Sequence, residues 1–213
     1  MADFFNKVVV NKLMIVSHPD DESIFGGCEL IDKEGEYKVV CLDYKSHPER
    51  SVEFAQAMLT LGVTEWEMYD AKKANGRYDE LWLNKVLSKH LSEKGWVKVV
   101  THNPIGEYKH KKHIQLHNAV ASFEDVRDIL WCFEHTGKRN WNKRFVRRKR
   151  EAIKQYKSQH DVLGWFSLKR ETLKRYKDYE GIVFHQSLLK ETKPIMKYDY
   201  VEDEDVKKYF TTL

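Results

Sequence analysis

The segment Leu13-Met14-Ile15-Val16-Ser17-His18-Pro19-Asp20-Asp21-Glu22 decides the fold class of this 213-residue chain. Four apolar residues in a row give way abruptly to polar ones. Such a run is typical of a parallel strand that is buried on both faces and ends in a polar loop. Two further apolar runs, at 37–43 and 96–101, also stop at polar residues. We therefore predict three strands of one sheet.

Helical patterns separate and follow these strands. Apolar residues recur three and four positions apart at 50–61, 78–91 and 113–123. Alternating strands and helices imply a parallel sheet with right-handed crossovers. The sequence therefore predicts an α/β fold, a Rossmann-like three-layer domain with a mostly parallel sheet.

The alternation is less regular after residue 125. Residues 125–133 fit either a strand or a short helix, and 147–159 fit a helix. The chain contains no repeat and no low-complexity linker, so we expect residues 1–213 to form a single domain. Its C-terminal part, 160–213, carries no motif that we can assign.

Composition limits the class of protein. Hydrophobic residues make up 41% of the chain, which is enough for a packed core, and a formal charge of +4 permits an anionic partner without requiring one. Cys28, Cys41 and Cys132 form no disulfide or metal-binding pattern, which favours a reducing compartment. Neither a signal peptide nor a membrane span is predicted, so we expect a cytoplasmic protein. An oligomer is compatible with the sequence.

The first polar cluster, His18–Glu22, directly follows a predicted strand. Ligands of open α/β sheets bind beyond the carboxyl ends of the strands. Adjacent carboxylates and an imidazole would lose solvation there unless a cation or hydrogen bonds offset the cost. A turn can direct His18 and Asp21 at one ion and leave Asp20 free to take a proton. An exposed turn with a helix cap would use the same residue types.

The second cluster lies at 106–117, shortly after the third predicted strand. His110, His113 and His117 share one face if this segment is helical. Imidazole is the commonest zinc ligand, and catalytic zinc typically has three protein ligands and a water. A solvated basic helix start is the alternative. Because both clusters follow strands of one predicted sheet, together they favour a metal site.

These motifs resemble those of the PIG-L/LmbE-like family of zinc-dependent de-N-acetylases. His18–Glu22 matches the family motif His-Pro-Asp-Asp-Glu in full. The second motif, Gly-x-Tyr-Gly-His-x-x-His, is matched at 106–113 with Lys109 in place of a glycine. Looser matches are Arg50, Glu53, Leu61-Gly62-Val63 and Ser158-Gln159. The resemblance spans roughly residues 13 to 160.

The resemblance implies zinc-dependent hydrolysis of an N-acetyl amide, with an N-acetylglucosamine-type sugar conjugate as the small-molecule substrate and acetate and a free amine as products. Zn²⁺, or another divalent metal such as Fe²⁺, would be held by His18, Asp21 and His113. Asp20 would be the general base, and His110 would act as an imidazolium on the oxyanion or the leaving amine. Substrate contacts would come from Arg50, Asp79 and Tyr108.

One departure concerns the residues between the two histidines. Many relatives have Pro-Asp or Pro-Gln where this chain has Lys111-Lys112. If Lys112 points toward His110, its charge should lower the pKa of that imidazole, because a like charge disfavours the protonated form.

Two other functions would each leave a recognisable pattern in the sequence. Eight of the thirteen residues at 138–150 are Lys or Arg, and Trp141 and Phe145 lie among them, as in some proteins that bind nucleic acid or another polyanion. A solvated loop and helix flank near the mouth of the active site is the better explanation of this segment, because the rest of the chain is nearly charge-balanced, so nucleic acid is not the expected partner. A nucleotide-binding Rossmann protein would need Gly-x-Gly-x-x-Gly, which Phe25-Gly26-Gly27-Cys28 does not supply.

Overall fold

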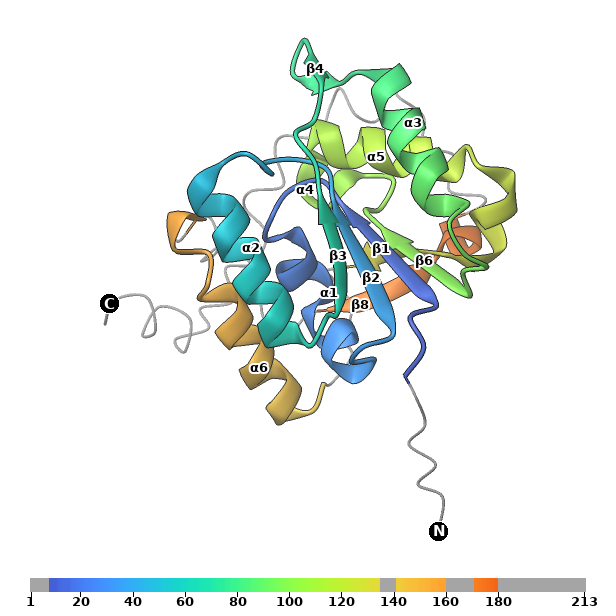
Figure 1. Ribbon diagram of the computed structural model, residues 1–213. Coiled ribbons are helices and arrows are strands. Elements are labelled where there is room, and N and C mark those ends of the chain that lie inside the picture. Colours follow the sequence, from blue (N-terminus) through green and yellow to red (C-terminus); the bar gives the residue numbers. More distant parts are fainter. Residues whose placement is uncertain (1–7, 135–140, 160–170, 180–213) are drawn as a thin grey trace.

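A computed structural model describes residues 8–134, 141–159 and 171–179. Its centre is a six-stranded sheet with the strand order β3-β2-β1-β6-β7-β8. The strands in this order are Glu65–Met68, Tyr37–Cys41, Lys12–Val16, Lys98–Thr101, Leu130–Glu134 and Thr172–Arg175. The first five run parallel, and β8 pairs antiparallel with β7. The predicted α/β class with a mostly parallel sheet is confirmed (Figure 1).

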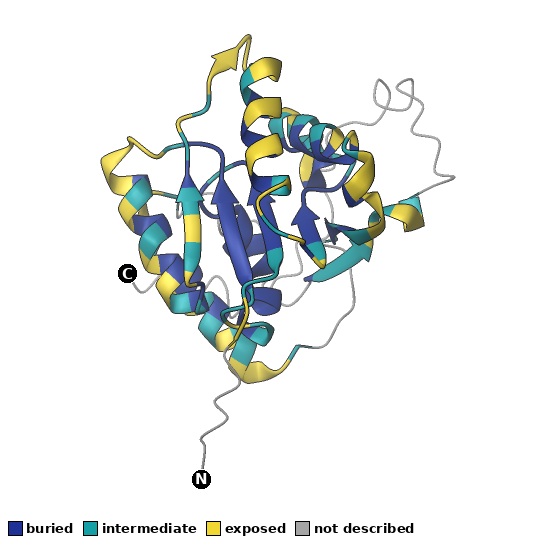
Figure 2. Cartoon of the chain, turned by 45° about the vertical axis from the view of Figure 1, so that its right-hand side comes forward, coloured by how far each residue is buried: buried dark blue, intermediate teal, exposed yellow. Residues whose placement is uncertain are grey.

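Helices cover both faces of the sheet and complete three layers. One face carries α1 (Asp21–Asp32), α2 (Pro48–Leu61) and α6 (Lys143–Ile153), and the other carries α3 (Glu80–Leu91) and α5 (Lys111–Ala121). Shorter helices are α4 (Gly106–Lys109), η1 (Glu124–Ile129), η2 (Lys157–Gln159) and η3 (Tyr176–Tyr179). A small hairpin, β4 (Lys73–Ala74) and β5 (Arg77–Tyr78), projects from the body and is mostly exposed (Figure 2).

The central strands are buried on both faces, which explains their continuous apolar sequence. Along β1, Leu13 and Ile15 belong to one hydrophobic cluster, whereas Met14 and Val16 belong to the cluster on the opposite face. All four side chains are fully buried. Because successive side chains of a strand point to opposite faces, a strand covered by helices on both sides needs apolar residues at every position.

Several element boundaries differ from the sequence prediction for identifiable reasons. Residues 125–133 contain both predicted alternatives, since η1 leads directly into β7. The helix predicted at 78–91 begins at Glu80, because Tyr78 belongs to β5 and Asp79 caps α3. The helix predicted at 147–159 begins earlier, at Lys143, behind the side-chain cap of Asn142, and ends at Ile153.

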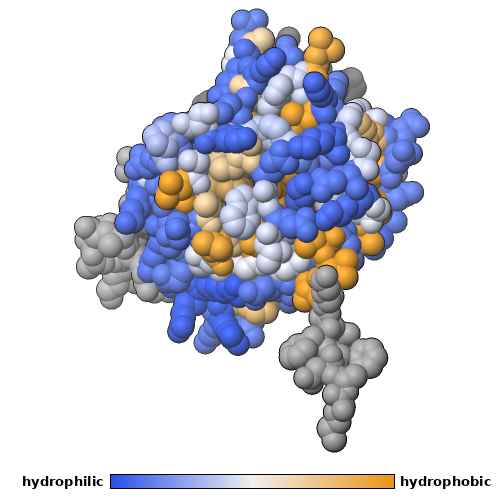
Figure 3. All heavy atoms as spheres, in the orientation of Figure 1, coloured by the Kyte–Doolittle hydropathy of each residue, from blue (hydrophilic) through white to orange (hydrophobic). Residues whose placement is uncertain are grey.

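Within the C-terminal region, Thr172–Arg175 adds β8 to the sheet, whereas 160–170 and 180–213 lie outside the described residues. Among the described helices, none has the length and apolar character to span a membrane. The face of the molecule shown in Figure 3 is mostly hydrophilic, with hydrophobic side chains in small separate groups.

Candidate metal centre and pocket

The loop that follows β1 folds back on the start of α1. The backbone N–H of His18 donates to Asp21 Oδ2 at 2.8 Å. Asp20 has a φ of 117°, which is uncommon for a residue with a side chain. Its N–H donates to Glu22 Oε2 at 3.1 Å, and Glu22 Oε1 accepts from the Tyr156 hydroxyl at 2.5 Å. The buried Glu22 carboxylate thus holds the unusual backbone of Asp20 in place.

At the end of β6, one buried carboxylate orients two imidazoles. Glu107 Oε2 accepts from Nδ1 of His113 at 2.6 Å and from Nδ1 of His102 at 2.9 Å. Its other oxygen accepts from the backbone N–H of Asn103 at 2.9 Å. Burial would raise the pKa of Glu107, but the two histidines lower it to about 2. Because both rings donate from Nδ1, the Nε2 atom of each ring has a lone pair for another partner when the imidazole is neutral.

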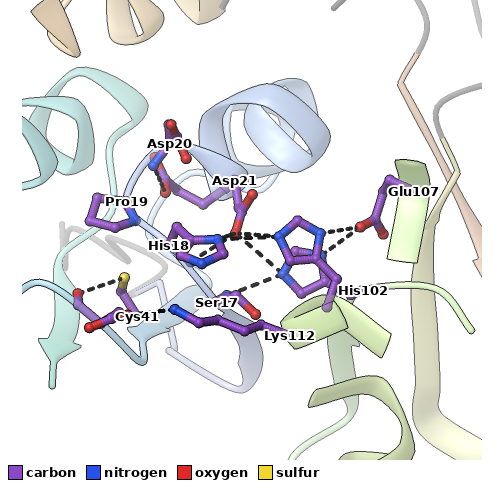
Figure 4. A network of polar contacts seen from close by, with 12 residues as sticks. Ser17, His18, Pro19, Asp20, Asp21, Cys41, His102, Glu107 and Lys112 are labelled. Carbon is purple, nitrogen blue, oxygen red and sulfur yellow. Dashed lines mark hydrogen bonds and ion pairs between the residues drawn. The ribbon is translucent and has the colours of Figure 1, made fainter. Parts of the chain in front are cut away.

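Three donor atoms from the two predicted clusters form a nearly equilateral triangle. His18 Nδ1 lies 3.3 Å from Asp21 Oδ2 and 3.3 Å from His113 Nε2, and the latter two atoms are 3.4 Å apart. A tetrahedral zinc ion with bonds of about 2.0–2.1 Å has neighbouring ligand atoms about 3.3 Å apart. The residues that were predicted to bind a metal therefore fit such an ion. Figure 4 shows two of them, His18 and Asp21, close together.

His102 is a second imidazole close to the same carboxylate. His18, His110 and His113 form one group of potential metal ligands, and Asp21, His102 and His113 form another. The Nε2 atom of His102 lies 3.4 Å from Asp21 Oδ2, and its ring stacks on His113 at 3.7 Å. This Nε2 also accepts the backbone N–H of Ser17 at 3.1 Å, which occupies its lone pair. The geometry therefore favours His18 over His102 as the third ligand.

Neither His102 nor Glu107 was predicted from the sequence to belong to the site, although the position of His102 in the sequence indicates a role there. His102 directly follows the apolar run of β6, just as the first cluster follows β1. No spacing pattern indicated Glu107, because its role depends on a positive φ of 54° that turns its side chain back toward the two rings.

The pocket beside this triangle has a volume of about 170 Å³. Its polar walls are His18, Asp20, Asp21, Tyr44, Arg50, Tyr108, His110 and Gln159, and its apolar walls are Ile24 and Phe25. Arg50 donates to the Pro19 carbonyl and lies 3.5 Å from Asp20 Oδ2. Asp79 does not line this pocket; its carboxylate caps α3 by accepting from the N–H of Trp82 at 2.8 Å.

The adjacent aspartates have opposite electrostatic environments. Burial and the neighbouring Asp21 charge raise the pKa of Asp20 well above its usual value, although Arg50 opposes this. Burial also disfavours the charged form of Asp21, but His113 and His102 hold its pKa well below the usual value. When two neighbouring carboxyl groups have pKa values that differ in this way, the one with the raised pKa can transfer a proton while the other stays negatively charged.

His110 lines the pocket, and its pKa is lowered by groups other than Lys112. Burial, followed by the neighbouring His113 and His18, lowers its pKa to about 3. Its Nδ1 is buried and has no hydrogen-bond partner among the described residues. The ammonium group of Lys112 instead lies 3.0 Å from Asp43 Oδ2. The condition under which we expected Lys112 to lower the pKa of His110, that it points toward this imidazole, is therefore not met.

His117 lies on α5 one turn beyond His113 but belongs to the core. It is 2% exposed, and its Nδ1 donates to the carbonyl of His102 at 2.8 Å. Burial lowers its pKa to about 4.

The stability of the protein should therefore depend on His117 in mild acid. The unfolded chain, in which this imidazole has a pKa of about 6.5, binds more protons between pH 4 and 6.5 than the folded chain does. This one group should cost about 2 kcal/mol of unfolding free energy as the pH falls from about 7.5 to 5. His117→Asn keeps an N–H donor but cannot titrate, so urea unfolding of this variant should show a flatter pH dependence. An identical slope in both proteins would refute the assignment.

Two cations of the basic segment form ion pairs with acidic residues of the same chain. Lys149 is fully buried against Glu171, and Arg148 forms two hydrogen bonds with Glu34 at 2.6 and 2.7 Å. Residues 138–140 lie outside the described part of the chain. The charges of Lys149 and Arg148 are therefore compensated within the protein.

Comparison with known proteins gives one relative in sequence and several in structure. No family model matches the chain. An uncharacterized protein, L374 of Acanthamoeba polyphaga mimivirus, is 35% identical over 121 residues, which cover 48% of this chain and 53% of that protein. The chain thus spans about half the length of this curated relative.

Three solved structures resemble the fold, each at 17% sequence identity. They are the conserved protein TT1542 of Thermus thermophilus (TM-score 0.56; 72% of this chain and 81% of that one), the N,N'-diacetylchitobiose deacetylase of Pyrococcus horikoshii (0.56; 70% and 70%), and the A40926 pseudoaglycone deacetylase Dbv21 (0.57; 72% and 84%). These likenesses show that the chain has the same α/β fold as these three proteins, two of which are named as deacetylases.

Proposed function

We propose that the chain is a metal-dependent deacetylase that hydrolyses the N-acetyl amide of an N-acetylglucosamine-type sugar conjugate, with acetate and a free amine as products. The observation that carries the proposal is the donor triangle of His18, Asp21 and His113 beside Asp20 in one pocket. The names of two proteins with the same fold, which are deacetylases, support this reaction class.

In this proposal His18, Asp21 and His113 hold Zn²⁺ or another divalent metal such as Fe²⁺. Such an ion, when bound, polarises an amide carbonyl and lowers the pKa of its water to about 7. Glu107 fixes the tautomer of His113, as carboxylates commonly do for ligating histidines.

Asp20 is the proposed proton carrier. Its carboxylate lines the pocket next to the triangle, and its backbone is fixed by Glu22. It would take a proton from the attacking water and transfer it to the leaving nitrogen.

The other polar walls would bind the substrate. His110 would donate a hydrogen bond to the carbonyl oxygen as charge develops on it. Tyr108 and Arg50 would contact the substrate as well, since both line the pocket. Asp79 lies outside the pocket walls, so we do not include it in the substrate site.

The function can be tested directly. The purified chain, supplied with Zn²⁺, should release acetate and free amine from N,N'-diacetylchitobiose or N-acetylglucosamine, and His113→Ala should not. Release should be followed both by an amine-reactive dye and by an acetate assay. Absence of both products from a panel of N-acetylated sugars, in the presence of Zn²⁺ or Fe²⁺, would reject the proposal.

Metal content provides a measurement that does not depend on the substrate. We expect about one divalent ion per chain, with a large loss in His18→Ala or His113→Ala, because removing one of three ligands leaves an incomplete site. His117→Ala is the matched control, since His117 lies on the same helix as His113 but outside the triangle. Metal analysis after dialysis distinguishes these variants. Equal metal content in all of them would contradict the ligand set.

A further inference from the structure

Among the described residues that line the pocket, two have wholly apolar side chains and lie next to each other in the sequence. Ile24 and Phe25 are the apolar side chains that line it, and they are 6% and 3% exposed. Both lie on α1, one helical turn after Asp20 and Asp21. The backbone N–H of Ile24 donates to the Asp20 carbonyl at 2.9 Å. Asp20, Asp21, Ile24 and Phe25 all line the pocket, so this apolar wall and the two carboxylates border the same space.

The position of this wall matches the chemistry of an acyl group. In an N-acylated sugar the hydroxyl groups require polar partners, whereas the acyl chain is the apolar part and is bonded directly to the carbon that is attacked. A carbonyl carbon placed next to Asp20 puts its acyl chain within about one helical turn of that residue. Building on the proposed function, we infer that Ile24 and Phe25 form an acyl wall that holds the acetyl methyl group and limits the length of the acyl chain.

The ring of Phe25 has little room to move, because other rings pack against it. Its centroid lies 5.8 Å from that of Phe133 and 6.4 Å from that of His113. The next residue, Gly26, is equally confined, since a Cβ there would lie 2.7 Å from Met14 Cε. Close-packed surroundings of this kind yield little to a larger ligand.

Ile24 is fixed through its backbone. Its carbonyl accepts from Lys149 Nζ at 2.6 Å, and this ammonium group is itself held by Glu171 at 2.6 Å. The fully buried ion pair therefore anchors the turn of α1 that carries the acyl wall. A longer acyl chain would have to displace either a packed ring or an anchored helical turn.

The acyl wall predicts a measurable preference. One methylene more or less in an apolar pocket changes kcat/KM by about 10–200-fold. The wild-type chain should therefore favour N-acetylglucosamine over N-butyrylglucosamine by about 100-fold or more. Ile24→Ala opens space beside Asp20 without lowering helix propensity, and it should reduce this ratio by at least about tenfold.

The test compares kcat/KM for N-acetyl-, N-propionyl- and N-butyrylglucosamine in Zn²⁺-loaded wild type, Ile24→Ala and Ile24→Val. Ile153→Ala is the matched control, because Ile153 is 2% exposed in the same core cluster but does not line the pocket. We expect both Ile24 variants to shift toward longer acyl groups, with the smaller shift in Ile24→Val, and the control to keep the wild-type ratio.

Two results would overturn the inference. One is a wild-type chain that hydrolyses the butyryl and acetyl substrates equally well, and the other is an unchanged ratio in both Ile24 variants. In either case acetyl hydrolysis by the wild type would leave the proposed function standing. A wild-type chain that binds metal but hydrolyses none of the three substrates, nor any N-acetylated sugar of the panel above, would reject the proposed function and the acyl wall together. The conservative Ile24→Val variant keeps the test decisive if Ile24→Ala does not fold.

Discussion

Asp20→Asn should retain the metal and lose about two to four orders of magnitude in kcat, which is the usual contribution of general acid–base catalysis. The amide is nearly isosteric with the carboxylate and leaves the N–H of Asp20 free to donate to Glu22 as before. It cannot, however, take up a proton from water. Substrate binding should change little, because Asp20 is proposed to act on the proton rather than on the sugar.

The adjacent Asp21 provides the control for this prediction. Asp21 Oδ2 is one corner of the donor triangle, so Asp21→Asn should weaken metal binding itself. Metal content and kcat should be measured on the same preparations of both variants. Loss of metal from Asp20→Asn to the same extent as from Asp21→Asn would show that the two roles are not divided in this way.

The sequence contained much of the candidate site because strand ends are easy to locate. The apolar run of β1 is continuous and ends at Val16, directly before Ser17 and His18, so both the strand and the polar loop could be predicted. Parallel neighbours end at the same edge of the sheet, which explains why His18 and His113 meet although they are 95 residues apart. The pairing of Glu107 with His102 and His113 depends instead on backbone turns that no residue spacing reveals.

Elements at the margins of the sheet were harder to predict for a related reason. β3 is an edge strand with the sequence Glu65-Trp66-Glu67-Met68, and only Met68 is buried. It therefore lacks the apolar run that marks β1. β4 and β5 are two residues long, so the turn residues Asn75-Gly76 were the available signal for this hairpin.

The basic segment shows how composition can mislead. Lys149 looks like one of eight solvated cations, but it lies on the buried stripe of α6 together with Ala152 and Ile153. Positions three and four residues apart share a helix face, so Lys149 follows the periodicity of the core rather than that of the surface. The missing information was its partner, because Glu171 is 22 residues away in the sequence.

Lys149→Met should destabilise the protein by about 3–5 kcal/mol, the usual cost when one partner of a buried ion pair is removed. The side chain of Lys149 packs tightly against Gly27, since a Cβ built on this glycine would lie 2.9 Å from Lys149 Cγ. A methionine at position 149 would still fill this space. What the variant loses is the charge that compensates Glu171. The Glu171 carboxylate also accepts from the backbone N–H groups of Cys28 and Glu29, at 2.9 and 2.8 Å.

These backbone contacts make the experiment more specific than a test of an ion pair alone. Replacing both partners by apolar residues often restores stability when a buried pair stands by itself. Here Lys149→Met combined with Glu171→Leu would also remove the hydrogen bonds that Glu171 accepts from the N–H groups of Cys28 and Glu29, so the double variant should remain destabilised. Lys143→Met on the exposed face of α6 is the control and should stay within about 0.5 kcal/mol of wild type. Urea unfolding at neutral pH measures all three variants. If Lys149→Met lowered the free energy of unfolding no more than Lys143→Met does, the ion pair would not be what fixes α1. The proposal that this pair anchors the acyl wall would then be refuted as well.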